Sequence, residues 1–376
     1  MNRKIKTAII GVGSMSYYET LKQFSVIEIA GVWDYEMEHI EAAAKEAGVR
    51  IFSSIEEILQ DPQIELVVNA FEPKCTYDYS KLLLEHGKHV YVGKLIADTF
   101  EKGQELCRLA NEKQLMFGCG PDCFMNGGMQ TARRLIDSGT IGNIRSGSVV
   151  LNRNSRLFGE FVTYLNEKDG SILHDVGAYY ILPLLEMLGP VAQVSAFGKK
   201  TEQVHKNIRL GGPLYGTESP VLDNNIFVAN VKFANGVLVS LNYNGATGIL
   251  QDYDFALYGD KGIIGMGHPH DYDIPVTLQT AAHGPIPIPF SHGFTKGVHF
   301  GVAAVEMAWA LVGGRKPRHT PETALHLLEV IKGIERSADE GGKLIKMETS
   351  MERQAPLPVG YIGNLPWEPG EEGALI

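Results

Sequence analysis

The first 120 residues alternate short apolar runs with helical segments, and this alternation restricts the fold more than any other feature of the chain. Ile5–Ile10, Ile27–Trp33 and Ile64–Ala70 are dominated by aliphatic residues, and a segment with helical periodicity follows each of them. Strands that are apolar on both faces belong to parallel sheets that are covered by helices on both sides. The pattern therefore predicts an α/β domain with a doubly wound parallel sheet over residues 1–124.

The pattern changes beyond about residue 125. Runs typical of antiparallel strands occur at Ala192–Gly198, Asn225–Phe233 and Val237–Tyr243, and Asn235-Gly236 predicts a two-residue hairpin turn between the last two. A long apolar helix is predicted near Ile172–Leu188. We therefore predict that residues 125–376 form an α+β domain with a large, mostly antiparallel open sheet.

Composition narrows the classes of partner. The formal net charge of −10 argues against nucleic acid, because proteins that bind phosphate backbones carry clustered Lys and Arg. The opening MNRKIKTAIIG leads directly into a strand, and no apolar run is long enough to cross a membrane. With only four cysteines in 376 residues, these features indicate a cytoplasmic enzyme with a small-molecule substrate.

A glycine motif follows the first predicted strand. In AIIGVGSMS, Gly11 permits a tight turn and Gly13 lets a pyrophosphate approach the backbone at the start of a helix. Ser16 replaces the third glycine of the usual motif. Asp34 ends the second strand, 23 residues after Gly11, where a carboxylate binds the adenosine ribose and repels a 2′-phosphate. A Rossmann domain that prefers NAD(H) to NADP(H) is predicted; the alternative is a glycine-rich turn beside an unrelated acid.

Several segments together resemble the glucose–fructose oxidoreductase / inositol dehydrogenase / MocA (Gfo/Idh/MocA) family, over nearly the whole chain. They are AIIGVGSMS, GVWD, GKHVYVGK, ARRLIDSGTIGNI, DGSILHDVGAYYILPLLEMLG, FANGVLVSL, YGDKGII and GRKPRHTPETALHLLEVIKGI. The resemblance implies an NAD(P)-dependent dehydrogenase that acts on CH–OH groups.

The same resemblance implies a role for the lysine that ends the strand in GKHVYVGK. In the family a Glu-Lys-Pro triplet stands here, and its lysine lies beside the nicotinamide and the reacting carbon. Lys94 occupies that place, whereas Gly93 replaces the glutamate and Leu95 replaces the proline. Loss of the proline removes the residue type that usually forms a cis bond. The alternative for Lys94 is a solvated lysine at a strand end.

A second candidate pair lies in HDVGAYY. Asp175 and Tyr179 are four residues apart, so a helix would project both from one face. The resemblance implies that Tyr179 is the acid/base, as in the glucose–fructose oxidoreductase and dihydrodiol dehydrogenase branch. An ammonium nearby favours phenolate, so Lys94 would assist Tyr179, and Asp175 is assigned to the lysine or to a substrate hydroxyl. The alternative for Tyr179 is a core tyrosine with its hydroxyl capped.

The complete set of expected site residues follows from the motif, the strand ends and the resemblance. The expected catalytic residues are Lys94, Tyr179 and Asp175. The expected cofactor contacts are Gly11, Gly13, Ser14, Met15, Asp34, Ala70, Phe71 and Lys94. The expected substrate contacts are Asp122, Asn152, Asn154 and His174. No metal is expected, because the spacing of His268, His270, Asp271 and Asp273 matches no established site.

These residues predict hydride transfer between NAD and a secondary alcohol of a sugar, polyol or similar small molecule. Two alternatives stay open: a glycosidase that requires NAD without net redox change, and a non-catalytic dinucleotide-binding sensor or regulator. An open antiparallel sheet needs a cover, so a homodimer or homotetramer is also expected.

Overall fold

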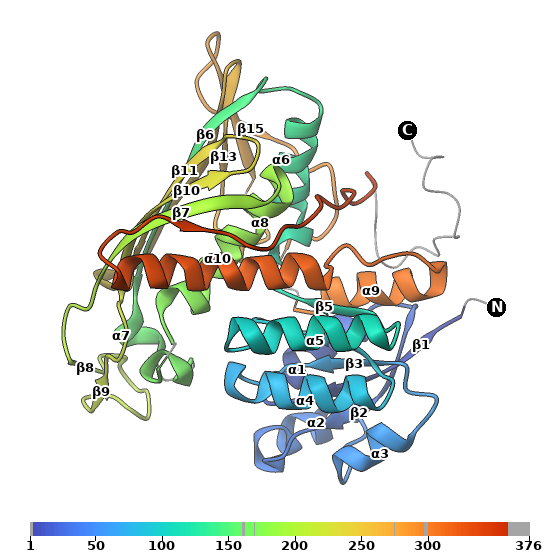
Figure 1. Cartoon of the computed structure of the whole chain (residues 1–376). Helices are drawn as coiled ribbons and strands as arrows, with labels where there is room; N and C mark the ends of the chain where they lie inside the picture. The colour runs from blue at the N-terminus through green and yellow to red at the C-terminus, as the bar shows by residue number, and fades with distance from the viewer. Residues whose placement is uncertain (1–2, 160–161, 169, 274, 297–299, 360–376) are drawn as a thin grey trace. The chain divides into compact units, whose positions relative to one another are not determined.

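The computed structural model describes residues 3–159, 162–168, 170–273, 275–296 and 300–359. The contacts between residues divide the chain into two compact units, and the helices and strands of both are labelled in Figure 1. The first unit comprises Met1–Met125, His292–Leu328 and Leu357–Ile376, and the second comprises Asn126–Ser291 and Glu329–Pro356. The division into domains at residues 124 and 125 stays a prediction; by contact, residues 292–328 group with the first unit.

The first unit contains a five-stranded sheet in the order β2-β1-β3-β4-β5, in which every neighbouring pair is parallel. This confirms the predicted doubly wound sheet. The strands are β1 (Ile5–Ile10), β2 (Ile27–Trp33), β3 (Leu66–Asn69), β4 (His89–Val92) and β5 (Phe117–Cys119). The helical segments are α1 (Ser14–Leu21), η1 (Met37–His39), α2 (Glu41–Ala47), α3 (Ile55–Gln60), α4 (Pro73–Glu85), α5 (Phe100–Glu112), η2 (Asp122–Met125) and α9 (Val302–Gly313).

Helix α9 joins this unit although it comes from the C-terminal part of the chain. Val302, Met307 and Trp309 lie in one buried cluster with Ile9 of β1 and Leu21 of α1. A helix that is apolar on every face needs partners all around it, and α9 finds them on the first unit. The sequence shows that α9 is buried but does not show against what.

The second unit is built on a nine-stranded sheet in the order β15-β14-β13-β12-β6-β11-β10-β7-β16, which is antiparallel except where β11 runs parallel to β6. The predicted hairpin at Asn235-Gly236 joins β10 to β11, and Gly236 has φ +89°. Its strands are β6 (Ile144–Asn154), β7 (Val191–Lys199), β10 (Ile226–Phe233), β11 (Leu238–Asn244), β12 (Ala246–Gly259), β13 (Gly262–Met266), β14 (Val276–Thr280), β15 (Ile286–Ile288) and β16 (Ile345–Lys346), with a separate hairpin of β8 (Val204–Lys206) and β9 (Glu218–Pro220).

The predicted apolar helix lies against this sheet, but it is not uniform. A short π-helix, η4 (Leu173–Gly177), leads into α8 (Ala178–Leu188), all of whose residues are buried. The ring of Tyr180 contacts Tyr243 of β11 and Phe255 of β12, which holds α8 on one face. The remaining helices are α6 (Gly127–Asp137), α7 (Ser155–Phe158), η3 (Thr163–Asn166) and α10 (Pro321–Asp339). Among the described residues no helix is long and apolar enough to cross a bilayer.

One buried histidine gives the first unit a dependence on pH. His319 lies between α9 and α10, and neither ring nitrogen has a hydrogen-bond partner among the described residues. Burial lowers its pKa to about 4, although the Glu306 carboxylate acts in the opposite direction. Because the folded pKa lies below the unfolded value, folding favours the neutral ring. The contribution of the neutral His319 ring to the free energy of unfolding is complete above about pH 6.5 and is lost as the pH falls towards 4.

We therefore expect the variant His319→Leu to lose part of the acid sensitivity of the parent. Between about pH 6 and pH 4.5, its free energy of unfolding should fall less steeply, by about 1 kcal/mol per pH unit, because the unfolded parent takes up one more proton. Urea denaturation at several pH values measures both slopes. Equal slopes would show that His319 is not neutral in the folded protein.

Candidate functional site

The turn between β1 and α1 makes a cradle that only glycine permits. Gly11 has φ +102°, and a Cβ there would lie 2.5 Å from the Phe71 nitrogen and 2.7 Å from the Ala70 carbonyl carbon. The Gly13 N–H donates to the Ala70 carbonyl at 3.2 Å. The chain therefore passes directly over the end of β3 before α1 begins, and the positive end of the α1 helix dipole at this turn favours an anion.

Two buried polar atoms near this turn lack hydrogen-bond partners among the described residues. They are Oδ2 of Asp34, which follows β2, and Oγ of Ser14, the first residue of α1. Asp34 Oδ1 accepts from the Glu36 N–H at 2.9 Å, and burial raises the pKa of the carboxyl group. An acceptor on Asp34 and a hydroxyl on Ser14 fit the ribose hydroxyls and phosphates of a dinucleotide, as does the glycine cradle.

The order of the sheet brings the predicted cofactor residues to one edge. Asp34, Gly11, Phe71 and Lys94 each follow one of four adjacent parallel strands, β2, β1, β3 and β4. The direction in which the strand order runs changes between β1 and β3, and that is where dinucleotides bind in such sheets. Met15, also predicted, is half-buried in the first turn of α1.

Aromatic side chains that were not predicted surround Phe71, a predicted cofactor contact, at this edge. Phe71 stacks on Tyr35 with ring centroids 5.4 Å apart and on Tyr79 of α4 at 4.4 Å, and Trp33 meets Phe71 and Tyr79 edge-on. Only the positions of Trp33 and Tyr35 on either side of Asp34 hinted at this cluster. The ring contacts depend on where α4 lies.

Lys94 follows β4 in a loop that differs from the expectation. Because a leucine replaces the proline, no cis bond was expected here. That expectation is wrong, since the Lys94–Leu95 peptide bond is cis. Lys94 is half-buried, and its ammonium lies close enough to oppose the effect of burial, which raises the pKa of the Cys119 and Cys123 thiols. The lysine is thus held at the sheet edge near the predicted cofactor residues.

The absence of a glutamate before Lys94 has a steric reason. A Cβ on Gly93 would lie 2.6 Å from the Tyr17 hydroxyl oxygen, which projects from α1. That separation is shorter than any ordinary contact, so a side chain at residue 93 requires the Tyr17 hydroxyl to move. The sequence showed the departure from the triplet but not its cause.

Both carboxylate oxygens of Asp122 accept hydrogen bonds from other residues of the first unit. It accepts from the Tyr91 hydroxyl at 2.7 Å and from the Gly301 and Ala303 N–H groups at 2.9 Å. These bonds tie η2 to the start of α9. Asp122 therefore has a structural role, and its role as a substrate ligand stays a prediction.

Asp175 has partners that were not predicted. Its Oδ2 lies 3.1 Å from Arg153 Nη1, and its Oδ1 accepts from the Tyr164 hydroxyl at 3.0 Å. Burial and Asp175 raise the pKa of the Tyr164 phenol well above its usual value, so Tyr164 is a hydrogen-bond donor. Nothing in the local pattern singled out Arg153, because it lies on β6, far from Asp175 in sequence.

Tyr179 is the second residue of α8, four residues after Asp175, and lies beside a histidine. Its buried ring meets the His270 ring edge-on, with centroids 5.2 Å apart. The next tyrosine, Tyr180, points differently, and its hydroxyl lies 3.0 Å from His268 Nδ1. Burial lowers the pKa of His268 to about 3, so this ring is neutral.

The predicted substrate contacts in the second unit lie on β6 and η4. His174 Nε2 lies 3.4 Å from Glu335 Oε1, and His174 and Lys332 hold the pKa of that carboxyl at about 2 despite burial. Asn154 is buried and accepts from Arg156 Nε at 3.1 Å, whereas Asn152 is half-buried. Their roles towards a substrate stay predictions.

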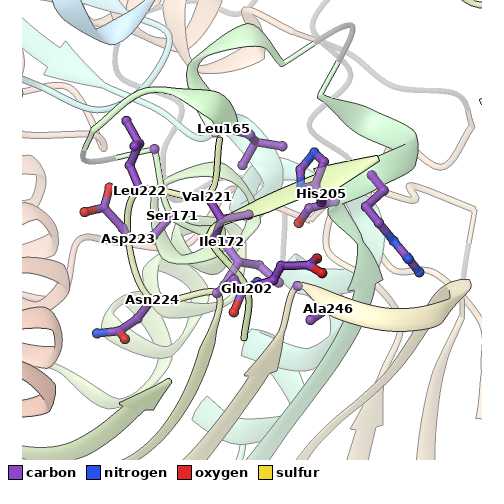
Figure 2. A pocket seen from close by; sticks show the side chains of 15 residues that line it. Leu165, Ser171, Ile172, Glu202, His205, Val221, Leu222, Asp223, Asn224 and Ala246 are labelled. Carbon is purple, nitrogen blue, oxygen red and sulfur yellow. The ribbon is translucent and has the colours of Figure 1, made fainter. Parts of the chain in front are cut away.

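Figure 2 shows a cavity of the second unit that is lined by segments far apart in sequence, among them Leu165, His205, Val221 and Ala246. Its volume is about 30 Å³, which is room for one or two waters and too little for a sugar. The buried Nε2 of His205, which lacks a hydrogen-bond partner among the described residues, is suited to such a water. This cavity is therefore not the substrate site.

Comparison with known families identifies the two halves of the chain. Residues 5–120 match an oxidoreductase family with an NAD-binding Rossmann fold, and residues 129–265 match the GFO/IDH/MocA C-terminal domain. The chain belongs to the Gfo/Idh/MocA family. The resemblance drawn from the sequence motifs is confirmed.

Relatives in the Gfo/Idh/MocA family are distant. The chain is 28% identical to an uncharacterized oxidoreductase of Schizosaccharomyces pombe over 208 residues, which cover 53% of this chain and 56% of the relative. It is 26% identical to scyllo-inositol 2-dehydrogenase (NADP(+)) of Bacillus subtilis over 203 residues, 52% of this chain and 55% of the relative. The chain thus spans little more than half the length of these relatives.

Solved structures agree with the family fold. Levoglucosan dehydrogenase, in complex with NADH and L-sorbose, has a TM-score of 0.78 and covers 92% of this chain and 99% of its own. An NAD binding oxidoreductase from Klebsiella pneumoniae also has a TM-score of 0.78, covering 91% of this chain and 98% of its own. At 18% and 16% identity these likenesses show the fold alone.

The contact between residue 93 and Tyr17 predicts a compensating pair of substitutions. Gly93→Ala should lower the free energy of unfolding by about 1–3 kcal/mol through overpacking. Tyr17→Phe removes the hydroxyl and leaves the ring carbon Cζ at 3.5 Å, an ordinary contact, so the double variant should recover most of the loss. Urea denaturation of the four proteins measures the coupling. Strict additivity would rule out the steric explanation.

Proposed function

We propose that the protein is an NAD(H)-dependent dehydrogenase that acts on a secondary alcohol of a sugar, polyol or similar small molecule. The observation that carries the proposal is the sheet edge at which the glycine cradle, Asp34 and Lys94 follow adjacent strands. Bound NAD⁺ would accept the hydride. Gly11, Gly13, Ser14 and Asp34 would hold the dinucleotide.

Asp34 supports the choice of NAD over NADP. Its buried Oδ2 is an acceptor without a hydrogen-bond partner among the described residues, which suits a ribose hydroxyl donor. A 2′-phosphate would bring negative charge against this carboxylate. His39 Nδ1 lies 3.6 Å from Oδ2 and offsets this charge when it is protonated.

Tyr179 and Lys94 are the proposed catalytic residues. The Tyr179 oxygen takes the hydroxyl proton during oxidation and returns it during reduction. An ordinary phenol is a weak base at neutral pH, and a positively charged group nearby favours the phenolate. His174, Asn152 and Asn154 would contact the remaining hydroxyls.

The wide sheet of the second unit supports self-association. One face is covered by α8, while the other exposes Phe197, Val228 and Leu238 at 65%, 49% and 57% of their areas. Exposed apolar side chains on one face of a large sheet favour a homodimer or homotetramer. All four cysteines are free thiols, which suits the reducing cytoplasm.

Substitution of the two proposed catalytic residues should separate turnover from cofactor binding. Tyr179→Phe and Lys94→Ala should each reduce kcat by about 10²–10⁴-fold towards a sugar or polyol that the parent oxidises, because general acid–base catalysis contributes that much. NADH absorbance measures turnover, and Tyr179→Phe should bind NADH as tightly as the parent.

Two surface substitutions serve as controls for that experiment. Lys113→Ala and Tyr77→Phe remove an ammonium bonded to the Glu85 carbonyl and a hydroxyl bonded to Glu105, and both should keep parental activity. Parental turnover in Lys94→Ala would refute its catalytic role.

Replacement of Asp34 should change the cofactor preference. Asp34→Ala removes both the ribose acceptor and the charge opposed to a 2′-phosphate, so the ratio of the NADPH to the NADH dissociation constant should fall by about tenfold or more. Cofactor fluorescence titrations measure the two constants. Glu28→Ala, at the other end of β2, is the matched control, and an unchanged ratio in Asp34→Ala would contradict the ribose role.

A further inference from the structure

We infer that Arg153 is a positioning residue for the reaction: through its ion pair with Asp175, it sets the charge that the Tyr179 phenol faces. The inference rests on the proposed function for Tyr179 as acid/base. It adds a residue from β6 that does not need to touch the substrate.

The ion pair is enclosed and both carboxylate oxygens are engaged. Arg153 Nη1 lies 3.1 Å from Asp175 Oδ2, and the two side chains are only 13% and 8% exposed. The guanidinium carbon lies 3.8 Å from the centre of the Phe158 ring, which covers the arginine from α7. Tyr164 donates to the other oxygen, so Asp175 is fixed on the side of Arg153 and Tyr164.

This arrangement matters to Tyr179 because the two residues lie one helical turn apart. A buried carboxylate at that separation opposes ionisation of a phenol, and an arginine in contact with the carboxylate cancels most of the effect. Without Arg153, the Asp175 charge would act on Tyr179 uncompensated in a poorly hydrated site. The pair thus keeps Tyr179 able to release and accept its proton near neutral pH.

Two histidines and a tyrosine are described around Tyr179 in the second unit. The His270 ring meets it edge-on from the segment between β13 and β14, and the neutral His268 ring lies 6.0 Å beyond. Tyr164, from η3, is a hydrogen-bond donor and carries no charge. Arg153 and Asp175 are therefore the ion pair beside this ring, and His270 adds a positive charge when it is protonated.

A mutant cycle distinguishes this role from a purely structural one. Arg153→Met should raise the apparent pKa of the Tyr179 phenol by about one pH unit or more, because a positive charge is lost. Asp175→Asn should lower the same pKa, because a negative charge is lost. The double variant should return towards the parental value, since both charges are gone. A pair that only stabilises the fold would lower stability without shifts of opposite sign.

The titration is followed in two ways. The pH profile of kcat gives the value in the working enzyme, and NMR of ¹³C-labelled tyrosine follows the Tyr179 resonance directly, assigned by its loss in Tyr179→Phe. Arg153→Lys, which keeps the charge, should retain the parental value. Arg145 lies on β6, as Arg153 does, and forms an exposed ion pair with Asp260. Arg145→Met is therefore the matched control and should leave the Tyr179 titration unchanged.

The outcomes separate the inference from the proposed function. An unchanged Tyr179 resonance in Asp175→Asn and in the double variant overturns the inference, whatever the turnover, even when Arg153→Met does not fold. Opposite shifts in the resonance support it. A parent that turns over no sugar or polyol with NAD overturns the proposed function, while the NMR titration still decides the charge relation.

Discussion

The nucleotide-binding edge of this protein depends on one close approach of backbone to backbone, between Gly11 and the end of β3. A side chain at Gly11 would collide with Ala70 and Phe71, so the turn can cross the sheet only because the residue has no Cβ. That crossing starts α1 beside β3, and the parallel strand order places Asp34 and Lys94 along the same edge. The proposed cofactor site depends on both features.

In the second unit, the buried charge of Asp175 constrains the arrangement of the residues around it. Asp175 is almost inaccessible, and a carboxylate in such a place needs a counter-charge and hydrogen bonds. Arg153 and Tyr164 supply both. The proposed acid/base, Tyr179, therefore lies next to a compensated charge, and this makes a role for its phenol near neutral pH physically reasonable.

The site illustrates how far local pattern reaches. The strands Ile5–Ile10 and Ile27–Trp33 have the predicted bounds, and the glycine turn and Asp34 stand where the spacing places them. The departure at Gly93 was visible in the sequence, but its cause, the Tyr17 hydroxyl, comes from a helix much earlier in the chain. The cis bond at Lys94–Leu95 was not expected without a proline.

Periodicity, glycine spacing and motif order were enough to identify the parallel sheet, the dinucleotide turn and the family, since each is a relation between residues close along the chain. The tertiary structure decided the partners: Arg153 for Asp175, the first unit for α9, and for His319 a buried place whose ring nitrogens have no hydrogen-bond partner among the described residues. Such choices depend on which distant strands and helices meet. Charge and burial are settled by that meeting, because a side chain's neighbours in space, and not its neighbours in sequence, set its energy.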